Sequence, residues 1–386
     1  MMKRLAIPLL VAASAFAQNA RWSPEDARNW YARQPWLVGS NYIPSYAINQ
    51  LEMWGADTFD PVRIDMELGW AQSLGFNTMR VFLHDQLWQQ SAFNFQRRID
   101  RFLWLADRHK IRVLFVLFDS CWDPFPEVNV RQRAPKPGVH NSGWVQSPGA
   151  KALMDPKQTD RFLEYVQQLI SAFAKDKRVL AWDLWNEPDN LNVGSYGASD
   201  PQGKAERVAA LLPRVYEYAR AAMPTQPLTS GVWQGDWSSP DKLSPVARLQ
   251  IDLSDVISFH SYGPPEEFEK RVKWLQAYGR PILCTEYMAR PQGSTFQSIL
   301  PIAKKYGLAA YNWGFVNGKT QTNLPWDSWQ HAYTDSEPPV WFHDVLTADG
   351  KPYRPEEADF LRQITAREAE AQPKGKKARK AAAAKP

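Results

Sequence analysis

Two glutamates lie near the ends of expected strands, where their carboxylates could take part in catalysis. The segment AWDLWNEPDN (181–190) reads as a buried apolar strand that ends at Asn186 and Glu187, directly before a chain-breaking proline. A second carboxylate, Glu286, lies near the end of the apolar segment PILCTEY (281–287). A carboxylate at the edge of an apolar core costs free energy unless it is paired or used. Two carboxylates facing each other could hydrolyse a glycosidic bond, one as the proton donor and the other as the nucleophile or base.

The chain that must position these groups contains eight short apolar runs. Longer amphipathic segments separate them, and this alternation is typical of repeated βα units with a parallel sheet. The expected strands are 36–41, 77–83, 112–118, 179–185, 227–233, 256–262, 281–287 and 308–315.

Helix starts are indicated by prolines that follow a capping residue. Proline is favoured at the first helical position, and an aspartate before it can cap the free backbone N–H groups. We expect a final helix over about 355–367. The other expected starts are Asp60-Pro61, Asp155-Pro156, Asp200-Pro201 and Pro264-Pro265.

Eight strands with interleaved helices predict a (β/α)₈ TIM barrel, an α/β fold with a single domain and long loops at its C-terminal face. An open doubly wound sheet is the alternative. That fold would bring a glycine-rich phosphate turn after its first strand, and the stretch GSNYIPSYAINQLEMW cannot serve as one. In a barrel, residues 119–154, 189–200 and 316–353 become long loops on the face where active sites form.

Polar and aromatic side chains gather at the expected C-terminal ends of these strands. In a closed barrel these ends surround one mouth, and the fourth and seventh strands face each other across it. Glu187 and Glu286 would therefore meet over a bound substrate. The other side chains placed there are Asn41, Arg80, Asp119, Asn186, His260, Tyr262 and Trp313.

This ordered set resembles the clan A retaining glycoside hydrolases, and most closely glycoside hydrolase family 5, the cellulase and mannanase family. The resemblance spans roughly residues 36–365. One position departs from the family, which commonly has a histidine at the end of the third strand. This chain offers Asp119 and Cys121 there, and His84 could partly compensate. The motifs that carry the resemblance are GSN (39–41), Arg80, WNEP (185–188), HSY (260–262), GRPILCTEY (279–287) and Trp313.

The resemblance implies a role for each matching residue. Glu187 would be the acid/base and Glu286 the nucleophile, and Asn186 would bind the sugar 2-hydroxyl. The remaining residues are expected to bind substrate or align the carboxylates: Arg80 and Tyr262 at the nucleophile, His260 at the acid/base or the sugar, Trp313 as the floor of the subsite, and Asn41 beside them. From the residues alone, Arg80 could instead form a structural ion pair at the barrel end, and His260 could be a satisfied polar residue.

The activity so predicted is hydrolysis of β-linked oligo- or polysaccharides by a two-glutamate double displacement. The long loops favour a groove with several subsites, hence an endo-acting β-mannanase or endo-β-glucanase. The same loops could wall off a pocket and give an exo-acting β-glycosidase. The same residues would also fit a transglycosylase, and the same barrel would fit a non-catalytic carbohydrate-binding protein. Tryptophans that could stack on sugars at flanking subsites are Trp122, Trp233, Trp237, Trp326 and Trp329.

No cofactor and no metal are predicted. The six histidines form neither an H-x-H strand motif nor an H-E-x-x-H helix, which are the usual zinc patterns. A G-x-S-x-G serine nucleophile motif is also absent.

The N-terminus predicts export. Residues 1–17 combine Lys3 and Arg4, an apolar run to about Ala13 and an A-x-A site at 15–17, as in a signal peptide. The barrel domain would cover 18–368, and the protein would be periplasmic or secreted. The apolar run is shorter than the ~20 residues of a membrane span, so no membrane insertion is expected.

The formal net charge of +5 does not indicate a nucleic-acid partner. Six lysines and arginines lie in the tail segment 373–386, and two more leave with the signal peptide, so the body carries a net charge of −3. We expect residues 369–386 to be a disordered basic tail. Cys121 and Cys284 are expected to be two separate buried thiols, and the protein to be a monomer whose partner is a β-linked glycan.

Overall fold

The computed structural model describes residues 20–128 and 131–366. The predicted signal peptide (1–17) and basic tail (369–386) lie outside these residues, so export and the tail stay predictions from the sequence.

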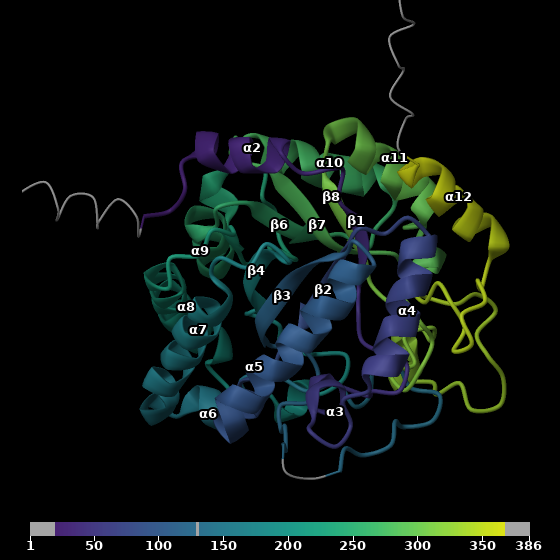
Figure 1. The fold of residues 1–386 in the computed structure, drawn as a ribbon, viewed down its shortest axis with the longest axis horizontal. Coiled ribbons are helices and arrows are strands. Elements are labelled where there is room, and N and C mark those ends of the chain that lie inside the picture. The colour runs from purple at the N-terminus through teal and green to yellow at the C-terminus, as the bar shows by residue number, and fades with distance from the viewer. Residues whose placement is uncertain (1–19, 129–130, 367–386) are drawn as a thin grey trace, which may run out of the picture.

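A ring of eight parallel strands forms the centre of the molecule, with helices around it (Figure 1). The strands pair in the order β5-β4-β3-β2-β1-β8-β7-β6. Between β5 and β6, a parallel bridge joins Val232 to Phe259, and the backbone N–H of Asp255 donates to the carbonyl of Leu228 at 2.8 Å. The predicted barrel is therefore confirmed. The strands are β1 (Val38–Asn41), β2 (Thr78–Phe82), β3 (Arg112–Asp119), β4 (Val179–Asn186), β5 (Leu228–Thr229), β6 (Ile257–His260), β7 (Ile282–Tyr287) and β8 (Ala309–Asn312).

Helices follow the strands as the βα pattern requires, and three long connections lie at the expected positions: after β3, after β4 and after β8. The helices are α2 (Pro24–Ala32), α3 (Gln50–Trp54), α4 (Pro61–Ser73), α5 (Asp85–Arg108), α6 (Ala150–Met154), α7 (Thr159–Phe173), α8 (Lys204–Ala221), α9 (Pro245–Leu253), α10 (Pro265–Gln276), α11 (Phe296–Tyr306) and α12 (Pro355–Thr365).

The fifth strand is shorter than the predicted 227–233. After Thr229, backbone groups of Ser230 and Gly231 form hydrogen bonds with side chains instead of with a neighbouring strand. The N–H of Ser230 donates to Ser254 Oγ at 3.2 Å, and the amide of Gln250 donates to the carbonyl of Gly231. The chain keeps its direction there but leaves the regular ladder.

Two helix starts also differ from the prediction. Asp155 caps a 3-10 turn, Pro156–Gln158, before α7 begins. Helix α8 begins at Lys204 rather than after Asp200, because the Asp200 carboxylate accepts hydrogen bonds from Asn192 and Lys204 instead of capping the helix. The starts at Pro61 and Pro265 are confirmed.

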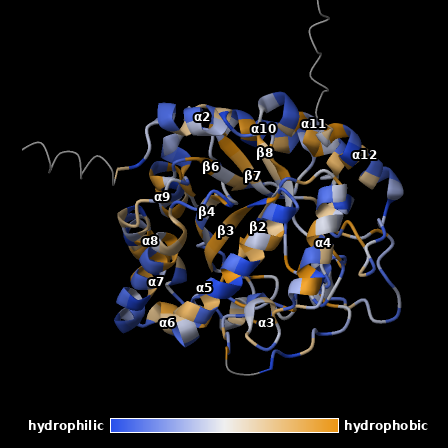
Figure 2. Cartoon of the chain, viewed as in Figure 1, coloured by the Kyte–Doolittle hydropathy of each residue, from blue (hydrophilic) through white to orange (hydrophobic). Residues whose placement is uncertain are grey.

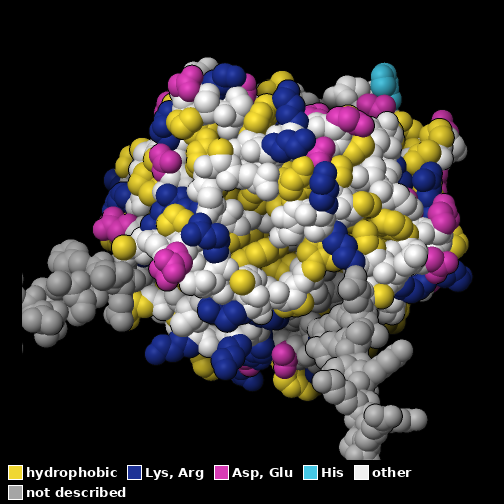
Figure 3. Space-filling view, turned by 90° about the horizontal axis from the view of Figure 1, so that it is seen from above, with side chains coloured by type: hydrophobic (Ala, Val, Ile, Leu, Met, Phe, Trp, Pro, Cys, Tyr) yellow, Lys and Arg dark blue, Asp and Glu magenta, His cyan; other side chains and the backbone are white. Residues whose placement is uncertain are grey.

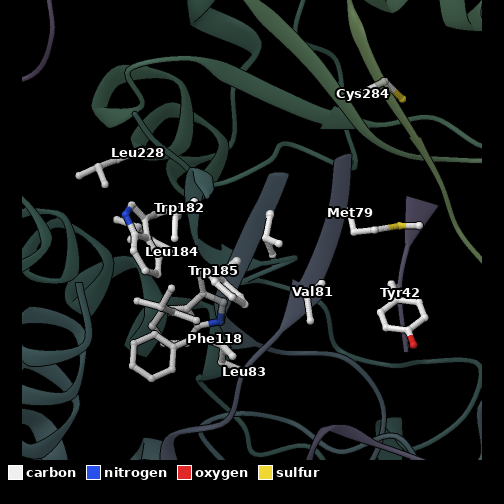
Figure 4. Close-up of a cluster of buried hydrophobic side chains, with 14 of the residues drawn as sticks. Tyr42, Met79, Val81, Leu83, Phe118, Trp182, Leu184, Trp185, Leu228 and Cys284 are labelled. Atoms are coloured by element: carbon white, nitrogen blue, oxygen red, sulfur yellow. The ribbon is translucent and has the colours of Figure 1, made fainter. Parts of the chain in front are cut away.

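The main core lies between the barrel and its helices (Figure 4). In α7, Phe162, Val166 and Leu169 share one face and are buried, and each such side chain contributes about 1.5–3 kcal/mol of burial free energy. Along β2, Met79 and Val81 pack in this core. Figure 2 shows the matching pattern, with mostly hydrophobic strands and helices of mixed hydropathy.

The N-terminal end of the barrel is covered by α2, whose Ala27 and Trp30 pack in a second buried cluster with Leu37 and Val256. Figure 3 looks onto this side of the molecule, where acidic and basic side chains are interspersed. Among the described residues, no helix is both long and apolar enough to cross a membrane.

Candidate active site

A cavity of about 670 Å³ opens where the strands end, and Glu187 and Glu286 both line it. One carboxylate oxygen of each, together with a ring nitrogen of His260, lies within 4.8 Å of the others. Glu187 directly follows β4, and Glu286 lies in β7. Barrel closure thus brings the two predicted carboxylates together across the mouth.

Glu286 is held at both oxygens. Arg80 Nη1 donates to Oε1 at 2.7 Å, and the Tyr262 hydroxyl donates to Oε2 at 2.6 Å. Burial raises the pKa of Glu286, while the Arg80 charge and the Tyr262 hydrogen bond act to lower it. The two residues expected at this carboxylate are therefore the ones in contact with it.

Arg80 lies beneath the cavity rather than in its wall. Strand alternation points its side chain into the barrel, where it is 0 % exposed and binds Asp183 at 2.8 Å as well as Glu286. The remaining N–H groups donate to the side-chain oxygens of Asn41 at 2.8 Å and Asn186 at 2.6 Å. Every nitrogen is thus engaged within the protein, so no N–H group of Arg80 is left for a substrate, and its contacts align other residues.

Asn41 is likewise a supporting residue. Its oxygen accepts from Arg80, and its Nδ2 donates to the carbonyls of Thr285 at 2.8 Å and Asn312 at 3.2 Å. Asn41 does not line the cavity that holds the glutamates. The structure therefore does not bring Asn41 to the substrate cavity with the other predicted residues, because its amide joins β1 to β7 and β8.

Glu187 has a different environment from Glu286. Its Oε1 lies 2.8 Å from His260 Nδ1, and its Oε2 accepts from Asn190 Nδ2 at 2.6 Å and from Cys121 Sγ at 3.2 Å. Burial raises its pKa. The backbone of Glu187 has φ +41°, a left-handed conformation that costs free energy in a non-glycine residue and is often found at functional sites.

His260 is neutral at ordinary pH, because burial lowers its pKa to about 4. Its Nδ1 also lies 3.4 Å from Glu286 Oε2, so the ring stands between the two carboxylates. Its Nε2 has no hydrogen-bond partner among the described residues and is buried. His260 and Tyr262 both line the cavity, as predicted.

Asn186 is fixed at both ends of its amide. Its oxygen accepts from Arg80, and its Nδ2 donates to Asp119 Oδ1 at 3.0 Å. Asp119 also accepts from Trp144 Nε1 at 2.6 Å, and burial raises its pKa to about 6. The sequence placed Asp119 at the barrel mouth but did not indicate what it contacts. Its carboxylate fixes the Asn186 amide, whose side chain lines the cavity.

Tryptophans form much of the cavity wall. Trp313 lies directly after β8 and packs edge-on against Phe82 at 5.8 Å and Trp144 at 5.7 Å. Trp122 and Trp329, from two different loops, stack with ring centroids 5.7 Å apart. The tryptophans that line the cavity are Trp122, Trp233, Trp313, Trp326 and Trp329.

Trp237, expected at a flanking subsite, is instead a core residue. It is 1 % exposed and packs against Phe259 and Trp274.

The expected compensation by His84 is wrong. His84 is buried outside the cavity, with Nδ1 capping α5 and Nε2 3.0 Å from the carbonyl of Gln146. His140 lines the cavity instead, 5.4 Å from the ring of Trp122, with Nδ1 2.8 Å from the Leu324 carbonyl. A histidine in the middle of a long loop carries no sequence signal that would have placed it there.

Among the described residues, Glu187, His260 and Glu286 form the one group with metal-ligand geometry. Arg80 already places a positive charge 2.7 Å from Glu286, which disfavours a second cation at that carboxylate. The arrangement is better suited to acid–base and nucleophilic chemistry.

A parallel barrel whose mouth holds two facing carboxylates among aromatic side chains defines a glycoside hydrolase. The model of the cellulase family, glycosyl hydrolase family 5, matches residues 70–331. The chain therefore belongs to glycosyl hydrolase family 5 and is a glycosidase.

Solved structures with this fold include several proteins that act on mannosides. An alanine variant of GH5_18 from Streptomyces cattleya, in complex with Manβ1-4GlcNAc, is 16 % identical with a TM-score of 0.58, and the match covers 85 % of this chain and 80 % of that one. The exo-β-1,4-mannosidase from Opitutaceae bacterium strain TAV5 is 18 % identical with a TM-score of 0.57, over 85 % of this chain and 59 % of that one. The endo-1,4-β-D-mannanase from Thermotoga petrophila RKU-1 is 15 % identical with a TM-score of 0.53, over 85 % and 99 %.

At these low identities, the structural similarity shows a shared fold and no more. A search of curated protein sequences finds no match to the chain.

Proposed function

We propose that the protein is a retaining β-glycosidase that hydrolyses β-linked glycans by double displacement, with Glu286 as the nucleophile and Glu187 as the acid/base. The observation that carries this proposal is the approach of the two carboxylates to within 4.8 Å, with Arg80 in contact with Glu286 but not with Glu187. Retaining enzymes need carboxylates about 5–5.5 Å apart, whereas inverting enzymes need roughly 6.5–9.5 Å to admit a water.

The charges around the pair favour this division of roles. Two carboxylates this close share one proton at neutral pH, because ionising both is costly. Arg80 and the Tyr262 hydroxyl stabilise Glu286 as the anion. Glu187 contacts only neutral groups, so the proton is expected on Glu187, as the first step requires.

In that step, a Glu286 oxygen attacks the anomeric carbon while the Glu187 proton moves to the departing glycosidic oxygen. In the second step, Glu187 takes a proton from water, and the water oxygen replaces Glu286 at the anomeric carbon. Asn186, held by Arg80 and Asp119, is positioned to bind the sugar 2-hydroxyl, and Trp313 offers a flat face beneath the ring.

The shape of the cavity favours exo action over the endo action expected from loop length. The leaving group lies on the Glu187 side, so the glycone lies by Glu286 and Trp313. Behind Trp313, Trp144 and Phe82 fill the space, and the cavity wall contains no residue of β1 or β2. A chain end would fit a site that is closed behind Trp313.

One observation favours the endo alternative. A second cavity of about 520 Å³ shares Trp326 and Gln292 with the first. Further glycone units of an internal chain segment could lie there.

The test is hydrolysis of a panel of β-linked manno-, gluco- and xylo-oligosaccharides, followed by proton NMR of the first product formed. We expect the β-anomer, with monosaccharide released stepwise from the non-reducing end. Internal cuts would favour the endo alternative. A first-formed α-anomer would contradict double displacement, and binding without turnover would favour the carbohydrate-binding alternative.

Tyr262→Phe should move the acidic limb of the pH profile. Glu286 must be ionised to act, and the Tyr262 hydroxyl at 2.6 Å lowers its pKa. Without this donor the pKa rises, so kcat/KM should be lost at a pH higher by roughly one unit. The measurement is kcat/KM from pH 3 to 9. An unmoved acidic limb would show that Tyr262 does not set the ionisation of Glu286.

A further inference from the structure

Cys121 places a thiol beside the proposed acid/base. Both Cys121 and Cys284 are free and buried, as predicted. Cys121 follows β3 by two residues, lines the cavity and lies with Sγ 3.2 Å from Glu187 Oε2. The side-chain amides of Asn186 and Asn190 donate to the same sulfur at 3.5 Å each. With two N–H groups directed at the sulfur, the S–H is left to donate to Glu187.

The two oxygens of Glu187 therefore differ. Oε2 accepts from Asn190 Nδ2 at 2.6 Å and from the Cys121 thiol. An amide N–H can only donate. Oε1 instead contacts His260 Nδ1, and a neutral imidazole nitrogen can donate or accept according to its tautomer. Only Oε1 can carry a proton without losing a hydrogen bond.

We propose that Cys121 is a positioning residue for the acid/base: with Asn190, its thiol keeps Glu187 Oε2 an acceptor and confines the catalytic proton to Oε1. This proposal rests on the proposed role of Glu187. In glycosylation the proton leaves Oε1 for the glycosidic oxygen as the bond from that oxygen to the anomeric carbon breaks. In deglycosylation a proton from water returns to Oε1.

The surroundings keep the thiol protonated. Burial raises the pKa of Cys121, and the nearby carboxylates of Glu187, Asp119 and Glu286 raise it further. A protonated thiol is a donor throughout the pH range in which the enzyme would work.

The hydrogen bond from the Cys121 thiol should also lower the pKa of Glu187. Burial raises this pKa, and the Cys121 and Asn190 hydrogen bonds act to lower it. The other titratable or charged groups around Glu187 are Arg80 from β2, Asp119 from β3, Asp189 from its own loop, His260 from β6, Tyr262 after β6 and Glu286 from β7. None of these changes when Cys121 is replaced.

The experiment compares Cys121→Ala, Cys121→Ser and the matched control Cys284→Ala, with thermal unfolding to establish that each is folded. The measurement is kcat/KM against pH on an aryl β-glycoside. We expect Cys121→Ala to move the alkaline limb to higher pH by up to about one unit. Cys121→Ser should restore the wild-type limb, because a hydroxyl also donates, and Cys284→Ala should leave it in place.

An alkaline limb that stays put in Cys121→Ala, or a serine variant that behaves like the alanine variant, would overturn the proposal. Glu187→Ala, measured in parallel, separates this failure from failure of the proposed function. If Glu187→Ala removes the alkaline limb and the Cys121 variants leave it unchanged, only the role of Cys121 is wrong. If Glu187→Ala keeps the limb, the assignment of Glu187 is wrong.

Discussion

Replacing Glu286 with alanine is expected to lower kcat on an aryl β-glycoside by about 10⁴–10⁶-fold, a loss typical of removing a nucleophile. The carboxylate oxygens of Glu286 are bound to Arg80 and Tyr262, so no other carboxylate is oriented in the same way. The variant also leaves a space the size of the lost carboxylate. Azide should enter it and restore turnover, giving the α-glycosyl azide from a β-glycoside.

Glu266→Ala is the matched control, because Glu266 lies exposed in the first turn of α10. It should keep wild-type activity. The assignment of Glu286 would not survive if Glu286→Ala kept more than a tenth of wild-type kcat, or if the azide product were the β-anomer. Thermal unfolding of both variants establishes that a loss of activity is not a loss of fold.

Much of the site was predictable because it depends on the ends of strands. Apolar runs fix where strands lie, and barrel closure then places their last residues around one mouth. These two steps were enough to predict that Glu187 and Glu286 lie close together. Arg80 was also expected at Glu286, and in the proposed mechanism this contact gives the two carboxylates different roles.

The parts that sequence did not predict depend on contacts between loops and on burial. His140 is placed by loop contacts, since Trp329 Nε1 donates to its carbonyl at 2.9 Å. No local pattern specifies which residue of a long loop meets another loop. Asn41 shows the effect of burial: its residue type and position fit a substrate contact, but three hydrogen bonds inside the barrel leave it no free group.

Glu187→Ala should show a loss that depends on the leaving group. General acid–base catalysis contributes about 10²–10⁴-fold. We expect a loss of that size in kcat/KM for natural glycans, whose alkoxide leaving group needs a proton, and little loss for 2,4-dinitrophenyl glycosides, which depart unassisted. The measurement is kcat/KM across aryl glycosides of graded leaving-group pKa, where the variant should give a steeper dependence than the wild type.

The second half of the reaction supplies an independent check. Without a general base, water attacks the glycosyl-enzyme slowly, so intact mass measurement of Glu187→Ala with a dinitrophenyl glycoside should detect the enzyme with one sugar attached. Azide needs no base and should release it as the β-glycosyl azide, opposite in configuration to the product expected from Glu286→Ala. Two products of opposite configuration from the two variants would require that the glutamates act on opposite faces of the same sugar. If both variants gave the same anomer, the proposed roles of Glu187 and Glu286 could not both be right.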